Sequence, residues 1–209
     1  MLHLIYPPNR EMLGMVRREP IVSTVLLSLR QHHLPSYRHS VRVAILVADI
    51  AYEQGIADED LCLVVRAALI HDVGKTTVPL AILSAPRRLE DEERKTMCGH
   101  AQRTVDDLKR MGMEDRRVLY IAGAHHEFQP DPYPRSRIRK YSIAERDRRS
   151  NNSFLTGLAE IVALADKCDA LTSKREYKPA FSPIEIEGAL YKGFTGDHQL
   201  IPLVMKRVA

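Results

Sequence analysis

The stretch Ala67-Ala68-Leu69-Ile70-His71-Asp72-Val73-Gly74-Lys75 decides the fold of this chain. An apolar run leads directly into a histidine and an aspartate, which places these two polar side chains at the buried end of a predicted helix. Buried imidazole and carboxylate groups need partners, because an unpaired polar group costs free energy inside a protein. A metal ion is a partner that both groups can share.

Further side chains of the same two types follow in order along the chain. Together with the central pair they form the candidate ligand set: His39, His71, Asp72, His100, His125, His126 and Asp166. Imidazole and carboxylate suit iron, manganese and zinc. The alternative, satisfied core or surface imidazoles, would require chance to produce the whole ordered set. The sequence therefore indicates a metal site without cysteine ligands.

Apolar residues recur at helical spacing nearly throughout the chain, and no segment is typical of a strand. Glycines, a capping box and polar residues mark the expected ends of the helices. The predicted helices run from His39 to Gly55, Asp58 to His71, Asp91 to Met111 with Gly112 as the stop, Glu114 to His125, Phe154 to Leu171, and onward from the capping box Ser182-Pro183-Ile184-Glu185. The fold class expected from this pattern is all-α.

Length and composition fit one compact domain, since 209 residues with 44% apolar content can fill a sizeable core. We expect residues 1–29 to form an N-terminal helical extension and residues 30–209 to form the main domain. The formal charge of +4 suits a phosphate compound, and nucleic acid is not expected as a partner. Three scattered cysteines favour a reducing compartment, so a cytoplasmic location is expected. No apolar run approaches the ~20 residues of a membrane span.

Four segments of the chain resemble the HD-GYP family, a branch of the HD phosphohydrolase superfamily associated with hydrolysis of cyclic di-GMP. The matching segments are His39-Ser40-Val41-Arg42-Val43-Ala44, Ala67 to Lys75, His125-His126-Glu127 and Ala165-Asp166-Lys167-Cys168-Asp169-Ala170-Leu171-Thr172-Ser173. The resemblance extends from about residue 30 almost to the end of the chain. It implies an HD-domain helical bundle with a dinuclear metal site.

The resemblance also implies a role for each candidate ligand. One divalent transition-metal ion would be bound by His39, His71 and Asp166, and the other by His100, His125 and His126, with Asp72 bridging the two. Iron or manganese is expected, with zinc, nickel and magnesium as alternatives. A hydroxide bridging the ions would attack phosphorus and open the cyclic dinucleotide to a linear one. Because Pro35 stands where some members have a glutamate, two ions are expected and not three.

Substrate contacts are implied in the same way. The lysine that corresponds to Lys75 lies against the substrate phosphate in the family, so Asp72 and Lys75 are the expected catalytic residues. Arg175 and Lys178 match a basic segment that would contact a second phosphate or a guanine base, although exposed charges at a helix end explain them equally well. Tyr133 would form a wall of the pocket.

One segment departs from the family pattern His-His-Glu-x-x-Asp-Gly-x-Gly-Tyr-Pro. This chain reads His125-His126-Glu127-Phe128-Gln129-Pro130-Asp131-Pro132-Tyr133-Pro134, without either glycine and one residue shorter. Because glycine permits positive φ and proline fixes φ, the path of this loop must change. We therefore expect altered substrate selectivity. The arginine-rich segment from Arg135 to Ser153 is either a solvated loop or a lid over an anionic substrate.

The best hypothesis is a phosphodiesterase that opens cyclic di-GMP. One alternative is an HD-type phosphohydrolase acting on another nucleotide or cyclic dinucleotide, since fold and metals do not select a substrate. Another is a non-catalytic domain that binds a nucleotide or a protein, although such a module would not need the complete ligand set. The expected partners are a phosphodiester or nucleotide and a signalling protein. His32, His33 and His198 are expected at the surface.

Overall fold

The computed structural model describes residues 7–56, 58–133, 151–173 and 181–208, and in these ranges all regular structure is helical. The main helices are α1 (Pro7–Val16), α2 (Pro20–His32), α3 (Leu34–Glu53), α4 (Asp58–Ile70), α5 (Leu80–Leu83), α6 (Asp91–Cys98), α7 (His100–Arg110), α8 (Arg116–Gly123), α9 (Asn151–Thr172), α10 (Pro183–Gly193) and α11 (Ile201–Met205). The described ranges also contain the 3₁₀ turns η1 (Val73–Thr77) and η4 (His198–Leu200). The all-α prediction is confirmed.

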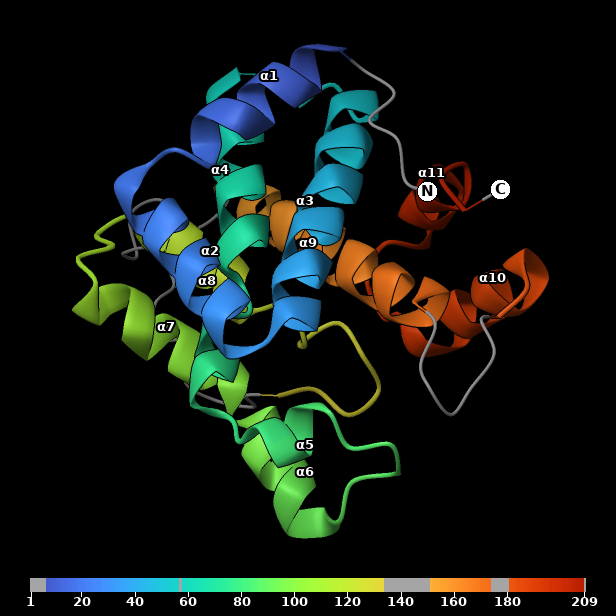
Figure 1. The fold of residues 1–209 in the computed structure, drawn as a ribbon. Helices are drawn as coiled ribbons and strands as arrows, with labels where there is room; N and C mark the ends of the chain where they lie inside the picture. Colours follow the sequence, from blue (N-terminus) through green and yellow to red (C-terminus); the bar gives the residue numbers. More distant parts are fainter. Residues whose placement is uncertain (1–6, 57, 134–150, 174–180, 209) are drawn as a thin grey trace.

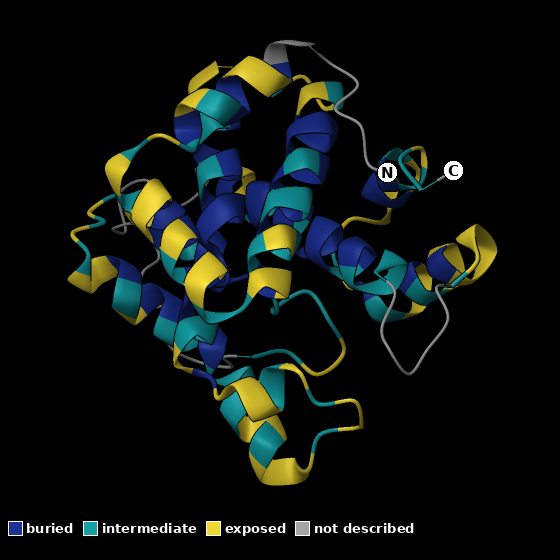
Figure 2. Cartoon of the chain, in the orientation of Figure 1, coloured by how far each residue is buried: buried dark blue, intermediate teal, exposed yellow. Residues whose placement is uncertain are grey.

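The centre of the bundle is formed by α3, α4 and α9, with α8 packed against α4 and α9 (Figure 1). The apolar residues that the helical spacing places on one side of α3, including Val43, Leu46 and Ile50, are buried there. Figure 2 shows buried residues gathered where these helices face one another. This packing brings residues from the two halves of the sequence together, because α3 and α9 lie side by side.

The N-terminal helices belong to the same apolar core. Both α1 and α2 contact α3 and α4, and Val22, Val25 and Leu29 of α2 are buried. The domain boundary expected at residue 29 stays a prediction, and α2 runs through that position. No helix in the described part of the chain has the length and apolar character needed to cross a bilayer.

The prediction of one helix from Asp91 to Met111 is wrong at its middle. The chain forms two helices there, α6 and α7, which meet at Gly99. The guanidinium of Arg103 packs so closely that a Cβ at Gly99 would lie 2.6 Å from its Nη1 atom. His100 begins a helix of its own. The predicted stop at Gly112 is confirmed, since this residue has φ of +87°.

The helix expected from Glu114 to His125 is shorter at both ends. The carboxylate of Asp115 accepts a hydrogen bond from the backbone N–H of Arg117, so α8 begins after this N-cap. The helix ends at Gly123, and His125 follows beyond it. The predicted capping box of Ser182 and Glu185 at the start of α10 is confirmed.

Candidate metal centre

Three histidines of the site are oriented by carbonyl groups at helix ends. The Nδ1 atoms of His71, His100 and His125 each lie 2.7 Å from a backbone oxygen three residues earlier, on Ala68, Met97 and Ala122 respectively. The last carbonyls of a helix have no partner within the helix, so they can accept these bonds. Because a carbonyl only accepts, Nδ1 carries the proton. When such a ring is neutral, its Nε2 carries no proton and can bind a metal.

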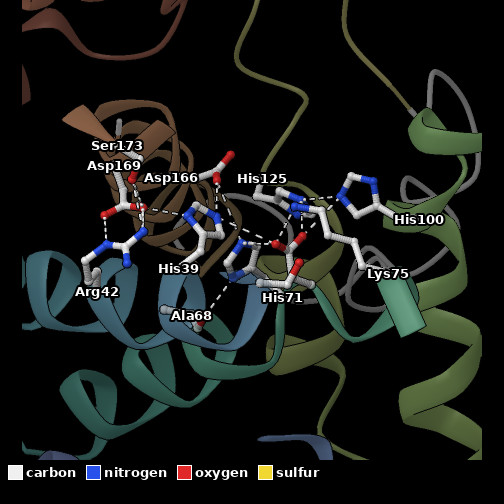
Figure 3. A network of polar contacts seen from close by, with 12 residues as sticks. His39, Arg42, Ala68, His71, Lys75, His100, His125, Asp166, Asp169 and Ser173 are labelled. Carbon is white, nitrogen blue, oxygen red and sulfur yellow. Dashed lines mark hydrogen bonds and ion pairs between the residues drawn. The ribbon is translucent and has the colours of Figure 1, made fainter. Parts of the chain in front are cut away.

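The rings of His39, His71, His100 and His125 gather in one place (Figure 3). Asp72, which is fully buried, lies among them. Its Oδ2 atom is 3.6 Å from Nε2 of His39 and 3.5 Å from Nε2 of His71. Its Oδ1 atom is 3.3 Å from Nε2 of His100 and 3.9 Å from Nε2 of His125. The two carboxylate oxygens thus face two different pairs of imidazoles, an arrangement suited to a group that contacts two cations.

The side chains gather into the groups that the sequence indicates. Ligand atoms of His39, His71 and Asp166 lie within 4.8 Å of one another, and so do those of His100, His125 and His126. A third group, His71, Asp72 and His125, joins the first two. All seven candidate ligands therefore meet in one place, although they come from α3, the ends of α4 and α8, α7 and α9. Their binding of metal remains a prediction.

The donors and charges fit divalent cations. The buried Nε2 of His71 and Oδ1 of Asp72 have no hydrogen-bond partner within the described ranges, although polar atoms at such positions need one. Burial opposes the charged form of Asp72, yet Lys75 and the neighbouring histidines hold the pKa of this carboxyl well below its usual value. Burial also keeps the pKa of His71 and His125 low. The result is an ionised Asp72 carboxylate beside the neutral imidazoles of His71 and His125, which are the forms that bind metal.

His39 is oriented by side chains instead of a carbonyl. Its Nδ1 lies 2.7 Å from Oδ2 of Asp169, and its Nε2 lies 2.9 Å from Oδ1 of Asp166. Burial alone would lower the pKa of His39, but hydrogen bonds to these two carboxylates raise it to about 9. In the metal-free protein the ring is therefore protonated at neutral pH. A cation that binds at Nε2 must displace this proton.

Asp169 is a site residue to which sequence reasoning gave no role. It is buried, and Arg42 holds it through bonds of 2.6 Å from Nε and 2.8 Å from Nη2. Its spacing could have indicated a place in the site, because Asp169 follows Asp166 by three residues and therefore lies on the same side of α9. The partner was not visible in the sequence, because His39 and Asp169 are 130 residues apart.

The turn after Asp72 depends on a close approach of two backbones. A Cβ at Gly74 would lie 2.2 Å from the carbonyl oxygen of His100, so only glycine fits there. The Thr104 hydroxyl donates to the carbonyl of His71 at 2.8 Å and accepts the N–H of Gly74 at 3.0 Å. These contacts hold η1 against α7. They fix Asp72 relative to His100.

The structure describes only some of the residues predicted to contact substrate. Lys75 lies beside the cluster, with Nζ 2.5 Å from Oδ2 of Asp72. The Tyr133 ring lies 4.5 Å from that of His126 and also lines a cleft of about 510 Å³, so it stands between the cleft and the cluster. Contact of either residue with substrate stays a prediction. Arg175, Lys178 and the arginine segment that includes Arg135, Arg137 and Arg139 lie outside the described residues.

We expect Asp169→Asn to weaken metal binding without unfolding the protein. The substitution removes the negative charge of the group that orients His39, and losses of this kind cost roughly 10–100-fold in metal affinity. In the metal-free protein the pKa of His39 should fall below about 9, because one of the groups that raises it is gone. Metal titration and NMR titration of the imidazole measure the two effects. Asp106→Asn, at an exposed carboxylate on α7, is the control and should change neither.

Comparison with known proteins shows which sequences and folds this chain resembles. The profile of the HD domain family matches residues 36–171. A 3'3'-cGAMP-specific phosphodiesterase of Vibrio cholerae is 34% identical over 70% of this chain and 29% of its own length. A cyclic di-GMP phosphodiesterase of Thermotoga maritima is 33% identical over 76% of this chain and 42% of its own. This chain therefore spans less than half the length of either relative.

Solved structures share the fold at lower identity. The HD domain of the L. monocytogenes phosphodiesterase PgpH, in complex with cyclic-di-AMP, has a TM-score of 0.58 at 18% identity and covers 88% of this chain and 93% of its own. An HDG"Y"P protein from Bdellovibrio bacteriovorus has a TM-score of 0.58 at 22% identity, covering 81% of this chain and 51% of its own. At these identities the likeness concerns the fold alone.

Proposed function

Since this chain belongs to the HD domain family, we propose that it is a metal-dependent phosphodiesterase that opens a cyclic dinucleotide to a linear one. The observation that carries the proposal is the position of Asp72, whose two oxygens face separate pairs of imidazoles. A buried carboxylate surrounded in this way is costly unless cations accompany it. The proposed ligands are those of the sequence analysis: His39, His71 and Asp166 for one ion, His100, His125 and His126 for the other, and Asp72 for both.

Bound divalent ions would supply Lewis-acid chemistry by stabilising the negative charge that develops on phosphoryl oxygens. The chain's own residues would orient the reacting groups. His71, His100 and His125 are held in one tautomer by carbonyls, so their Nε2 atoms need no reorientation before binding. Lys75 is a cation beside the buried cluster, with Nζ 2.5 Å from Oδ2 of Asp72, and we assign it to a non-bridging oxygen of the reacting phosphate. The burial of Asp72 and His71 keeps bulk water away from the inner side of the site.

The class of substrate follows from the relatives. The curated relatives are named for 3'3'-cGAMP or cyclic di-GMP, and a related fold is solved with cyclic-di-AMP. A cyclic dinucleotide is the chemistry common to all of them. Cyclic di-GMP is the first candidate for this chain, as the sequence analysis expects. The altered loop that ends in Tyr133 borders the open cleft, so we expect it to decide between dinucleotides and smaller phosphodiesters.

The test uses purified chain loaded anaerobically with iron(II) or manganese(II). Cyclic di-GMP, 3'3'-cGAMP, cyclic-di-AMP and bis(p-nitrophenyl) phosphate are assayed in parallel with chromatographic identification of products. We expect a linear dinucleotide from at least one cyclic substrate and no turnover by the metal-free chain. If protein that holds two ions hydrolyses none of the dinucleotides, the proposal is wrong. Preference for bis(p-nitrophenyl) phosphate over cyclic di-GMP would support the expected effect of the loop.

Lys75→Ala should lower turnover while leaving the metal content unchanged. The loss of a positively charged contact to the phosphate removes stabilisation that grows in the transition state, for which a decrease of roughly 100-fold in kcat is expected. Steady-state kinetics and elemental analysis of the same sample measure both quantities. Lys192→Ala, at an exposed lysine of α10, is the matched control. Wild-type turnover by Lys75→Ala would remove Lys75 from the mechanism.

A further inference from the structure

His33 is half-buried between α2 and α3, whereas the sequence analysis expects it at the surface. It occupies the N-cap position of α3, but its side chain accepts no backbone N–H there. Its Nδ1 atom lies instead 2.8 Å from the hydroxyl oxygen of Ser36. The imidazole is therefore anchored at one nitrogen and does not cap the helix.

The anchor of His33 differs in kind from those of the candidate metal ligands. A carbonyl can only accept, so it leaves Nε2 of His71 without a proton. The Ser36 hydroxyl can donate to Nδ1 of His33, and the neutral ring then carries its proton on Nε2. Among the described residues, the hydrogen-bond contact of this nitrogen is a long one of 3.4 Å to the hydroxyl of Ser84. His33 thus has a hydrogen-bond donor available for a further partner.

The surroundings place this donor on the side of the site that carries Lys75. The Nε2 atom of His32 donates to the carbonyl of Val78 at 2.9 Å, which holds the end of α2 against the residue that follows η1. Lys75 lies within η1, and α2 packs against this turn. Burial lowers the pKa of His33, the charges of Lys75 and His32 lower it further, and the charge of Asp72 opposes them. His33 is thus within electrostatic reach of the reacting centre without being one of its candidate ligands.

We infer that His33 is a substrate-contacting residue, whose Nε2–H donates a hydrogen bond to an anionic phosphate oxygen beside Lys75. The inference rests on the proposed function and deepens it, since it assigns a second phosphate contact at the same site. A phosphate oxygen beside two donors from different elements is held in position as well as neutralised. The α2–α3 junction thereby takes part in binding, and the buried Ser36 fixes the direction of the ring.

Asparagine and glutamine substitutions at His33 distinguish the role of Nδ1 from the role of Nε2. The amide of His33→Asn can occupy the place of Nδ1 and keep the Ser36 contact, but it does not reach the position of Nε2. We expect this variant to bind metal as the wild type does and to raise KM for the best phosphodiester about tenfold, the effect of one lost hydrogen bond to a charged group. The longer amide of His33→Gln reaches the position of Nε2 and should restore part of the loss. His198→Asn, at an exposed histidine, is the matched control.

A second measurement does not depend on turnover. Inorganic phosphate is titrated into zinc-loaded protein while the ring protons of His33 are followed by NMR. Shifts that saturate in the wild type and are weakened by Lys75→Ala support the contact, even if no dinucleotide is hydrolysed and the proposed function fails. An unchanged KM in His33→Asn, together with phosphate-insensitive His33 signals, would overturn the inference. So would a lowered melting temperature in both variants with no change in KM, because that result assigns His33 a structural role.

Discussion

Asp72→Asn should abolish measurable phosphodiesterase activity and remove both metal ions at once. The substitution keeps the size of the side chain but removes the charge that faces His39 and His71 on one side and His100 and His125 on the other. A loss of roughly 1000-fold or more in kcat is expected, since removal of a single preorganised electrostatic partner already costs 10²–10³-fold. Elemental analysis and turnover of the same preparation measure the outcome.

The control for this experiment is His198→Ala. Its ring is exposed, bonds the carbonyl of Phe194 and belongs to none of the candidate metal groups. The variant should keep two ions and full activity. An Asp72→Asn protein that retains both ions and turns over normally would show that Asp72 is not shared. Retention of one ion only would assign Asp72 to a single site and reject the bridging arrangement.

Gly74→Ala should destabilise the protein by roughly 3 kcal/mol or more, at the upper end of what overpacking a core costs. The added methyl group would stand 2.2 Å from the carbonyl oxygen of His100 and 2.6 Å from the backbone nitrogen of Thr104. Neither is the end of a flexible side chain, so η1 must move away from α7. This shift separates Asp72 from His100, and metal affinity should fall together with the free energy of unfolding. Denaturant unfolding and metal titration measure the two effects.

The same substitution at Gly188 provides a control of opposite sign. Gly188 is exposed on α10, and no atom lies within 4 Å of the position a Cβ would take. In an exposed helix, alanine is more favourable than glycine by about 1 kcal/mol, so Gly188→Ala should stabilise the protein slightly. If Gly74→Ala were as stable as Gly188→Ala, the close packing of η1 against α7 would be refuted.

The sequence by itself determined the helices and the identity of the side chains that meet. Helical spacing of apolar residues depends on local geometry, so it predicted α3, α4, α8 and α9, with ends that differ, and the capping box of α10. It also set the order of His39, His71, His100, His125 and Asp166 along the chain. Each of these residues lies on or next to the buried face of a helix. The spacing of nearby apolar residues is enough to predict that position.

Helix interruptions and ends were less accessible, because individual side-chain contacts accompany them that the apolar spacing does not reveal. Gly99 interrupts the predicted helix where the Arg103 guanidinium packs on its backbone, although nearby residues continue the helical pattern. Helix α8 begins after the N-cap Asp115 and ends at Gly123, two residues before His125. Periodicity predicts that an element exists, whereas competing side-chain contacts set its limits.

Only the tertiary structure decided how the site residues are held. His39 and Arg42 both bond Asp169, which lies far from them in the chain. The imidazoles on the two sides of Asp72 likewise include residues distant in sequence, His39 and His100. The need for glycine at position 74 is likewise visible only once η1 meets α7. Such contacts depend on the angles and offsets at which helices pack. Those are set by the fit of whole apolar faces, which no local stretch of sequence encodes.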